Sequence, residues 1–100
     1  MINYQVIVEY LGTNFVGWQR QKNGLSIQEI IEKALSKYFR CKVVIHGSGR
    51  TDAGVHALGQ SATFIVSSKN KVFNKQVFIN SINFFLKENT VSVLKLRKKK

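Results

Sequence analysis

The sequence predicts an α+β fold, a ferredoxin-like β-α-β-β-α-β sandwich in which two helices cover one face of an antiparallel sheet. Three observations lead to this prediction. Four segments have the alternating or β-branched composition of strands, two have the apolar spacing of helices, and they follow one another in that order. A chain of 100 residues corresponds to one domain, so we expect residues 1–100 to form a single folded unit.

The first strand is predicted over residues 2–10, where apolar and polar side chains alternate. One side of this strand carries Tyr4, Val6, Val8 and Tyr10. Since both helices are expected on one sheet face, Tyr4 and its partners indicate that the other face is partly apolar too. Residues 11–24 then break the alternation with glycines and asparagines and are predicted to form a long loop, the kind that is usually functional or disordered.

A helix is predicted to begin after Ser26, because Ser26 and Glu29 have the S-x-x-E spacing of a capping box. The following apolar residues repeat on one helix face: Ile27, Ile30, Ile31, Ala34, Leu35, Tyr38 and Phe39. Acidic residues lie in its first turns and basic residues in its last, as the helix dipole favours.

The remaining elements are shorter. Strands are predicted over residues 42–46, 59–66 and 90–96, with a polar turn over 67–71. Cys41 precedes a β-branched run and is interpreted as a small core residue. Asn74 is predicted to cap a second helix whose inward side chains are Phe78, Ile82, Phe85 and Leu86. The basic run 97–100 is interpreted as a solvated tail, a basic arm or the cut end of a longer protein.

The charge is strongly unbalanced, with 16 Lys and Arg against 5 Asp and Glu and a sequence pI of about 10.2. Such a balance favours a nucleic-acid partner, with anionic lipid or a merely basic soluble surface as alternatives. The single cysteine, Cys41, excludes an internal disulfide and fits a reducing compartment. The N-terminus lacks the features of a signal peptide, and no apolar run is long enough to span a membrane. We therefore expect a cytoplasmic protein without a membrane partner.

The segment HGSGRTDAGVHA, residues 46–57, contains the only aspartate of the chain, Asp52. It fails the dinucleotide and phosphate-loop patterns, the nucleophile elbow and the ligand spacings of metal sites, so no metal is expected. Two interpretations of Arg50 and Asp52 remain. The aspartate either stabilises a turn and pairs with the arginine, or it is a carboxylate kept ionised by a cationic neighbour and usable as a nucleophile or base.

Two motifs resemble the tRNA pseudouridine synthase A family: GWQRQ at residues 17–21 and GRTDAGVHA at residues 49–57. The resemblance implies an isomerase that converts uridine to pseudouridine in the anticodon stem-loop of tRNA, without a cofactor or metal. It implies that Asp52 is the catalytic carboxylate and that Arg50 enters the RNA as the base leaves and then pairs with Asp52. It also implies a homodimer for the full-length protein.

Further roles follow from the same resemblance. Four residues are expected to contact RNA: Arg20, Gln21, Arg50 and His56. Four others are expected to determine the shape of the loop: Gly47, Gly49, Thr51 and Gly54. Family members have two similar halves, and the second half supplies a tyrosine and further basic residues. We therefore expect this chain to be the N-terminal half and to be incomplete for catalysis alone. The alternatives are a non-catalytic RNA-binding module, although the aromatic motif of such modules is missing, and an interaction domain whose charge is incidental.

Overall fold

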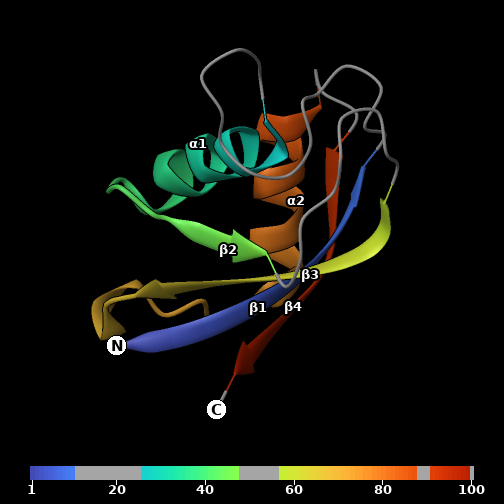
Figure 1. Cartoon of the computed structure of the whole chain (residues 1–100). Coiled ribbons are helices and arrows are strands. Elements are labelled where there is room, and N and C mark those ends of the chain that lie inside the picture. Colours follow the sequence, from blue (N-terminus) through green and yellow to red (C-terminus); the bar gives the residue numbers. More distant parts are fainter. Residues whose placement is uncertain (11–25, 48–56, 88–90, 100) are drawn as a thin grey trace.

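The computed structural model describes residues 1–10, 26–47, 57–87 and 91–99 and confirms the predicted α+β architecture (Figure 1). The elements follow the predicted order, with one additional short 3₁₀ helix, η2. They are β1 (Ile2–Tyr10), α1 (Ile27–Phe39), β2 (Ile45–Gly47), β3 (Ala57–Val66), η2 (Ser68–Asn70), α2 (Lys75–Leu86) and β4 (Val91–Lys99).

The strands form one antiparallel sheet in the order β2-β3-β1-β4. Both helices pack on the same face of this sheet, as predicted (Figure 1). We call the other face the open face. Alternation along β1 decides which side chains reach which face, because neighbouring residues of a strand point in opposite directions. Its buried side chains are Ile2, Tyr4, Val6, Val8 and Tyr10, and those of the open face are Asn3, Gln5, Ile7 and Glu9.

The expectation that Tyr4 and its partners face away from the helices is wrong, because Tyr4 lies on the helix-covered face of the sheet. It is 3% exposed, packs against Phe64 with ring centroids 5.6 Å apart, and its hydroxyl accepts a hydrogen bond from the Val72 backbone N–H at 2.9 Å. The open face is nevertheless partly apolar, through the half-buried Ile7 and the exposed Ile65.

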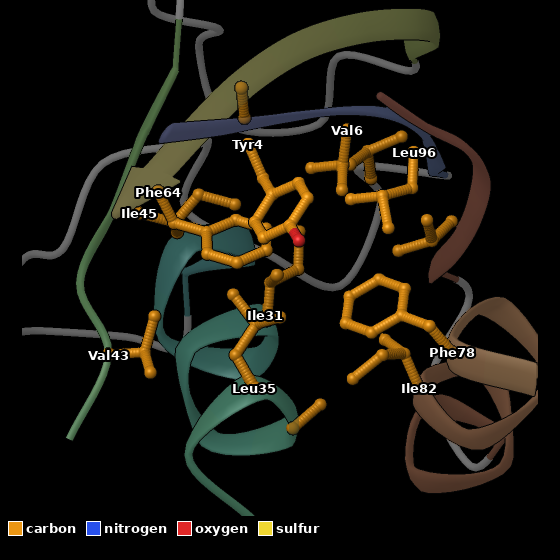
Figure 2. Packing of buried hydrophobic residues seen from close by; sticks show 14 of the residues in the cluster. Tyr4, Val6, Ile31, Leu35, Val43, Ile45, Phe64, Phe78, Ile82 and Leu96 are labelled. Atoms are coloured by element: carbon orange, nitrogen blue, oxygen red, sulfur yellow. The ribbon is translucent and has the colours of Figure 1, made fainter. Parts of the chain in front are cut away.

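Aromatic side chains from the sheet and both helices meet in the core, and Figure 2 shows Tyr4 and Phe64 of the sheet with Phe78 of α2. The rings of Phe39, Phe64 and Phe78 all contact one another, with centroid distances of 5.8 Å for Phe39–Phe64, 6.3 Å for Phe64–Phe78 and 6.0 Å for Phe39–Phe78. Phe78 also contacts Tyr38 edge to face at 5.0 Å. Such pairs stabilise by about 0.5–1.5 kcal/mol each beyond their burial, so this cluster fixes how the two helices sit on the sheet.

Both predicted helix caps are confirmed. The Ser26 hydroxyl is fully buried, accepts the Glu29 N–H at 3.1 Å and donates to a Glu29 carboxylate oxygen at 3.4 Å. The Asn74 side chain accepts the Val77 N–H at 3.0 Å. Each side chain thereby satisfies a backbone donor that the first turn of a helix leaves without a partner.

Two predicted core residues are not in the core. Cys41 is exposed, because it directly follows Arg40, the left-handed residue that ends α1 and turns the chain. Phe85 is 37% exposed, whereas Phe78, Ile82 and Leu86 are buried. The three buried residues of α2 are spaced by four, so Phe85 lies to one side of their stripe and contacts Lys37 instead, with the ammonium 5.7 Å from the ring centroid.

Three strands differ from their predicted limits, and one of them, β3, begins at Ala57 rather than at residue 59. The strand predicted over 42–46 has ladder pairing only at Ile45–Gly47, because the Val43 N–H donates to the Ser36 hydroxyl of α1 at 3.1 Å rather than to β3. The last strand extends to Lys99, so the basic residues 97–99, for which a tail, a basic arm or a cut end was expected, belong to β4 and pair with β1.

No helix in the described part of the chain is both long enough and apolar enough to cross a bilayer.

Candidate RNA-binding and catalytic site

Most of the predicted site residues lie outside the described residues: Arg20, Gln21, Gly49, Arg50, Thr51, Asp52, Gly54 and His56. Their roles therefore stay predictions. Gly47 is described and is the last residue of β2, paired with Ala62 of β3. It stands at the point where the chain enters the segment that carries Asp52.

The strand register brings the ends of three segments together. Tyr10, the last residue of β1, pairs with Ala57 on one side and with Val91 on the other. Tyr10 precedes the segment 11–25, Ala57 follows the segment 48–56 and Val91 follows the segment 88–90. The two predicted motifs, at 17–21 and 49–57, are therefore attached to neighbouring strands at the same end of the sheet (Figure 1).

A side-chain hydrogen bond holds this end of the sheet together. The Tyr10 hydroxyl donates to the Gln60 Oε1 atom at 2.6 Å, and Tyr10 itself is 1% exposed. A buried tyrosine with a satisfied hydroxyl orders both the ring and its partner strand. The attachment points of the two motifs are thus fixed relative to each other, which a site built from both would require.

Both neighbours of β1 contain an extra residue near the same end. On β3 the extra residue is Gly59, with a φ of 91°, and it lies between the pairs Val8–Gln60 and Glu9–Leu58. On β4 the extra residue is Leu94. Such β-bulges increase the local twist and redirect side chains, and they are common next to functional sites. The sheet is therefore distorted on both sides of β1, near the end to which the motif-bearing segments are attached.

A depression of about 390 Å³ lies between α1 and residues 42–43. Its charged lining is Lys33, Lys37 and Lys42 together with Glu29 and Glu32. Glu32 is buried and its carboxylate accepts the Ile45 N–H at 2.9 Å, so it serves to join α1 to β2. This mixture of charges gives no preference for an anionic ligand.

Within the described ranges, no three His, Cys, Asp or Glu side chains lie close enough together to bind a metal ion. His46 lies within β2, exposed and paired with Thr63.

One charged surface was not predicted from the sequence. Lys95, Arg97 and Lys99 share the open face of β4, where they pair with Ile7, Gln5 and Asn3. The signal was present in the pattern Val91-x-Val93-x-x-Leu96, in which the apolar spacing changes from two residues to three. A change of that kind within a strand indicates a bulge, after which the alternation continues with the opposite parity.

Comparison with known proteins gives concordant results. A family model described as tRNA pseudouridine synthase matches residues 6–86, which include both motifs. The chain is 52% identical over 99 residues to the tRNA pseudouridine synthase A of Pelagibacter ubique, covering 99% of this chain and 39% of that protein. It is 47% identical over 98 residues to the protein of that name from Ehrlichia canis, with 97% and 39% covered. The chain thus spans about 39% of the length of these relatives.

Proposed function

Because the chain belongs to the tRNA pseudouridine synthase family, we propose that it is the Asp52-bearing N-terminal domain of an enzyme that converts uridine to pseudouridine. We further propose that the uridines lie in the anticodon stem-loop of tRNA. The observation that supports the proposal is that GRTDAGVHA is inside the matched region and in the connection from β2 to β3, and that its last residue, Ala57, pairs with Tyr10 at the end of β1.

The chemistry assigned to Asp52 is cleavage of the bond between uracil N1 and ribose C1′. The carboxylate either attacks C1′ or removes a proton from the sugar, and in both cases the bonding electron pair leaves with the uracil. The base then rotates and C5 bonds to C1′, while the Asp52–C1′ bond breaks or, on the proton-abstraction route, the proton returns from Asp52 to the sugar. The proton on C5 is then lost and N1 gains a proton. Substrate and product are isomers, so no external oxidant, reductant or cofactor is required.

Arg50 is assigned to the access step. A uridine stacked in RNA has to leave the stack before its C1′ can be reached, at a cost of a few kcal/mol. A planar guanidinium can stack in the vacated space and contact phosphates, which suits Arg50 to hold the opened RNA. When paired with Asp52, it would also keep that carboxylate ionised. Arg20, Gln21 and His56 are proposed as further RNA contacts, with Gly47, Gly49, Thr51 and Gly54 shaping the loop.

The net charge of +11 supports an RNA substrate, because Lys and Arg neutralise phosphates and release counterions. The remaining length of the relatives is proposed to complete the site, and the full-length enzyme is proposed to be a cytoplasmic homodimer.

The test uses a chimera. The 99 matched residues of the Pelagibacter ubique protein are replaced by this chain, which gives a protein of the relatives' full length. Pseudouridine formed in a transcribed tRNA is then mapped by carbodiimide labelling and mass spectrometry. We expect modification in the anticodon stem-loop, and a loss of rate of at least about a hundredfold for Asp52→Asn, since an acid–base group typically contributes that much.

Glu9→Gln is the matched control, because Glu9 is an exposed carboxylate on β1 whose loss changes the charge equally. It is expected to keep the rate of the unaltered chimera. Pseudouridine formation that survives Asp52→Asn would refute the catalytic assignment. A chimera that binds tRNA but modifies none of it would favour the non-catalytic RNA-binding module instead.

A further inference from the structure

We propose that the open face of β4 binds the phosphodiester backbone of RNA through Lys95, Arg97 and Lys99, which we call the basic stripe. The choice of RNA as the partner rests on the proposed function. The arrangement of the three cations rests on the strand register alone.

The register places the basic stripe on one face. Lys95 pairs with Ile7, Arg97 with Gln5 and Lys99 with Asn3. In an antiparallel ladder, directly paired residues point to the same face. The three partners lie opposite the buried side chains of β1, so the three cations project from the sheet face that the helices do not cover. All three are exposed.

The bulge at Leu94 creates this arrangement. Val93 pairs with Val8 on the helix side, and Lys95 pairs with Ile7, so Leu94 has no partner of its own on β1. Without that extra residue, Lys95 would lie opposite Val6 and enter the core, and Leu96 would be exposed. The extra residue lets Leu96 be buried at 5% exposure while the basic residues stay outside.

Asn83 of α2 stabilises the bulged part of β4. Its side chain accepts the Val93 N–H at 2.7 Å and donates to the Val93 carbonyl at 3.0 Å. These bonds satisfy the backbone of an edge strand at the residue before the bulge, where another chain would otherwise be able to pair. Asn83, on the helix side of the sheet, therefore stabilises the strand register that exposes the basic stripe.

Arg97 is held by side chains on the open face of β1 and β3. Its Nε–H donates to the Gln5 Oε1 atom, and the Gln5 amide nitrogen donates to the Ser61 hydroxyl of β3. A guanidinium has five N–H donors, and the bond to Gln5 uses one of them. The hydrogen bond to Gln5 restrains the Arg97 guanidinium, which lowers the entropy cost of binding a phosphate with its terminal nitrogens.

The surroundings favour an anion. A shallow groove of about 350 Å³ is lined by Gln5, Ile7, Lys95, Leu96 and Arg97, which include two cations and no acid. Among the described residues, Glu9 is the only carboxylate on the open face, since the others, Glu29 and Glu32, belong to α1. The positive potential at the stripe is therefore not cancelled by a close acidic neighbour within the described part of the face.

The spacing favours a chain of phosphates over a single anion. Alternate residues of a strand are about 6.8 Å apart, so the basic stripe is a row of three cations along one line. Flexible Lys and Arg side chains on such a row can each contact a phosphate of one RNA strand. Beside them, Ile7 and Ile65 are separated by the polar side chains of Asn3, Gln5, Ser61 and Thr63. The face therefore lacks the continuous apolar surface that insertion into a lipid layer requires.

The test measures binding of a transcribed tRNA to the chain at several salt concentrations. Lys95, Arg97 and Lys99 are replaced together by Gln in one variant. The matched control replaces Lys33, Lys69 and Lys75 by Gln, because these exposed lysines lie on the helix side and their loss changes the net charge equally. Circular dichroism and urea unfolding confirm that both variants are folded.

For the stripe variant we expect the slope of log K against log salt to become shallower by about 2–3, since each phosphate contact contributes about 0.7–0.9. If the lines converge near 1 M salt, this corresponds to roughly a hundredfold weaker binding near 0.15 M. The variant in which Lys95 and Lys99 become Arg and Arg97 becomes Lys keeps the charges and is expected to bind within a few-fold of the original chain.

Equal effects of the stripe variant and the helix-side control would overturn the inference, because binding would then depend on net charge alone. Loss of binding to anionic phosphatidylserine vesicles, with tRNA binding unchanged, would also overturn it and point to a membrane surface. In the chimera, the stripe variant should raise KM and leave kcat unchanged. An unchanged KM there, together with inactivity of Asp52→Asn, would refute the stripe and leave the proposed function standing.

Discussion

Replacing Gly59 tests whether the bulge on β3 depends on backbone conformation rather than on space. The φ of Gly59 is 91°, a value that residues with a side chain rarely adopt, and Gly59 is exposed to solvent. A Cβ added there would meet the Ile7 Cγ2 atom at 3.7 Å, which is an ordinary contact. Steric overlap therefore contributes little, and the cost of Gly59→Ala is the backbone strain, about 1–2 kcal/mol.

The assay is urea unfolding of the chain followed by circular dichroism. With an m-value of about 1.5 kcal/mol/M, Gly59→Ala should lower the midpoint by roughly 1 M. The order of variants is more decisive than one value. Strain predicts that stability falls from Gly to Asn to Ala to Val, because asparagine tolerates positive φ best and β-branched residues tolerate it worst.

Intrinsic strand propensity predicts the opposite order, since valine is favoured in strands and glycine and asparagine are disfavoured. A series in which Gly59→Val is the most stable variant would refute the strain argument. It would mean that β3 and β1 can pair without the extra residue. The Tyr10–Gln60 hydrogen bond and the position of Ala57 would then not depend on the bulge.

Two further changes test how the helices are joined to the sheet. Asn83→Ala removes both side-chain hydrogen bonds to Val93, and we expect a loss of about 1–3 kcal/mol in the free energy of unfolding together with faster exchange of the Val93 amide hydrogen. An unchanged exchange rate would show that Asn83 does not hold β4. Glu32→Ala leaves the buried Ile45 N–H without its acceptor, and a loss of about 1–3 kcal/mol is expected by urea unfolding, whereas Glu29→Ala should cost less because Ser26 still caps the helix. Equal losses for these two variants would contradict the role assigned to Glu32.

The predicted helices were found because their signals are local. Ser26 and Asn74 accept backbone N–H groups three residues ahead, and the apolar spacing of α1 lies within one segment. Such contacts depend on a few neighbouring residues, so the sequence states them directly. Phe85 was misplaced because the edge of an apolar stripe is defined by what packs against it, not by spacing alone.

The strands were harder to delimit because their ends depend on partners far along the chain. β2 is limited to Ile45–Gly47 because the Val43 N–H pairs with Ser36 of α1. β4 continues through Arg97 to Lys99 because β1 offers a partner to its whole length. A basic run that ends a sequence gives no sign of such a partner.

For the candidate site, too, some features could be predicted from the sequence and others required the folded structure. The motifs that carry Asp52 and Arg50 were recognised in the sequence, since a run of specific residues identifies a family without any structure. The register that attaches both motifs beside Tyr10 required the folded sheet.

By itself, the sequence determined the fold class, the helix caps, the excess of positive charge and the resemblance that the family match bears out. Only the tertiary structure decided which face of the sheet that charge occupies. The reason is that a single extra residue, Leu94, reverses the direction of every side chain after it, and whether a strand contains a bulge is settled by the neighbouring strand and by the helix packed over it.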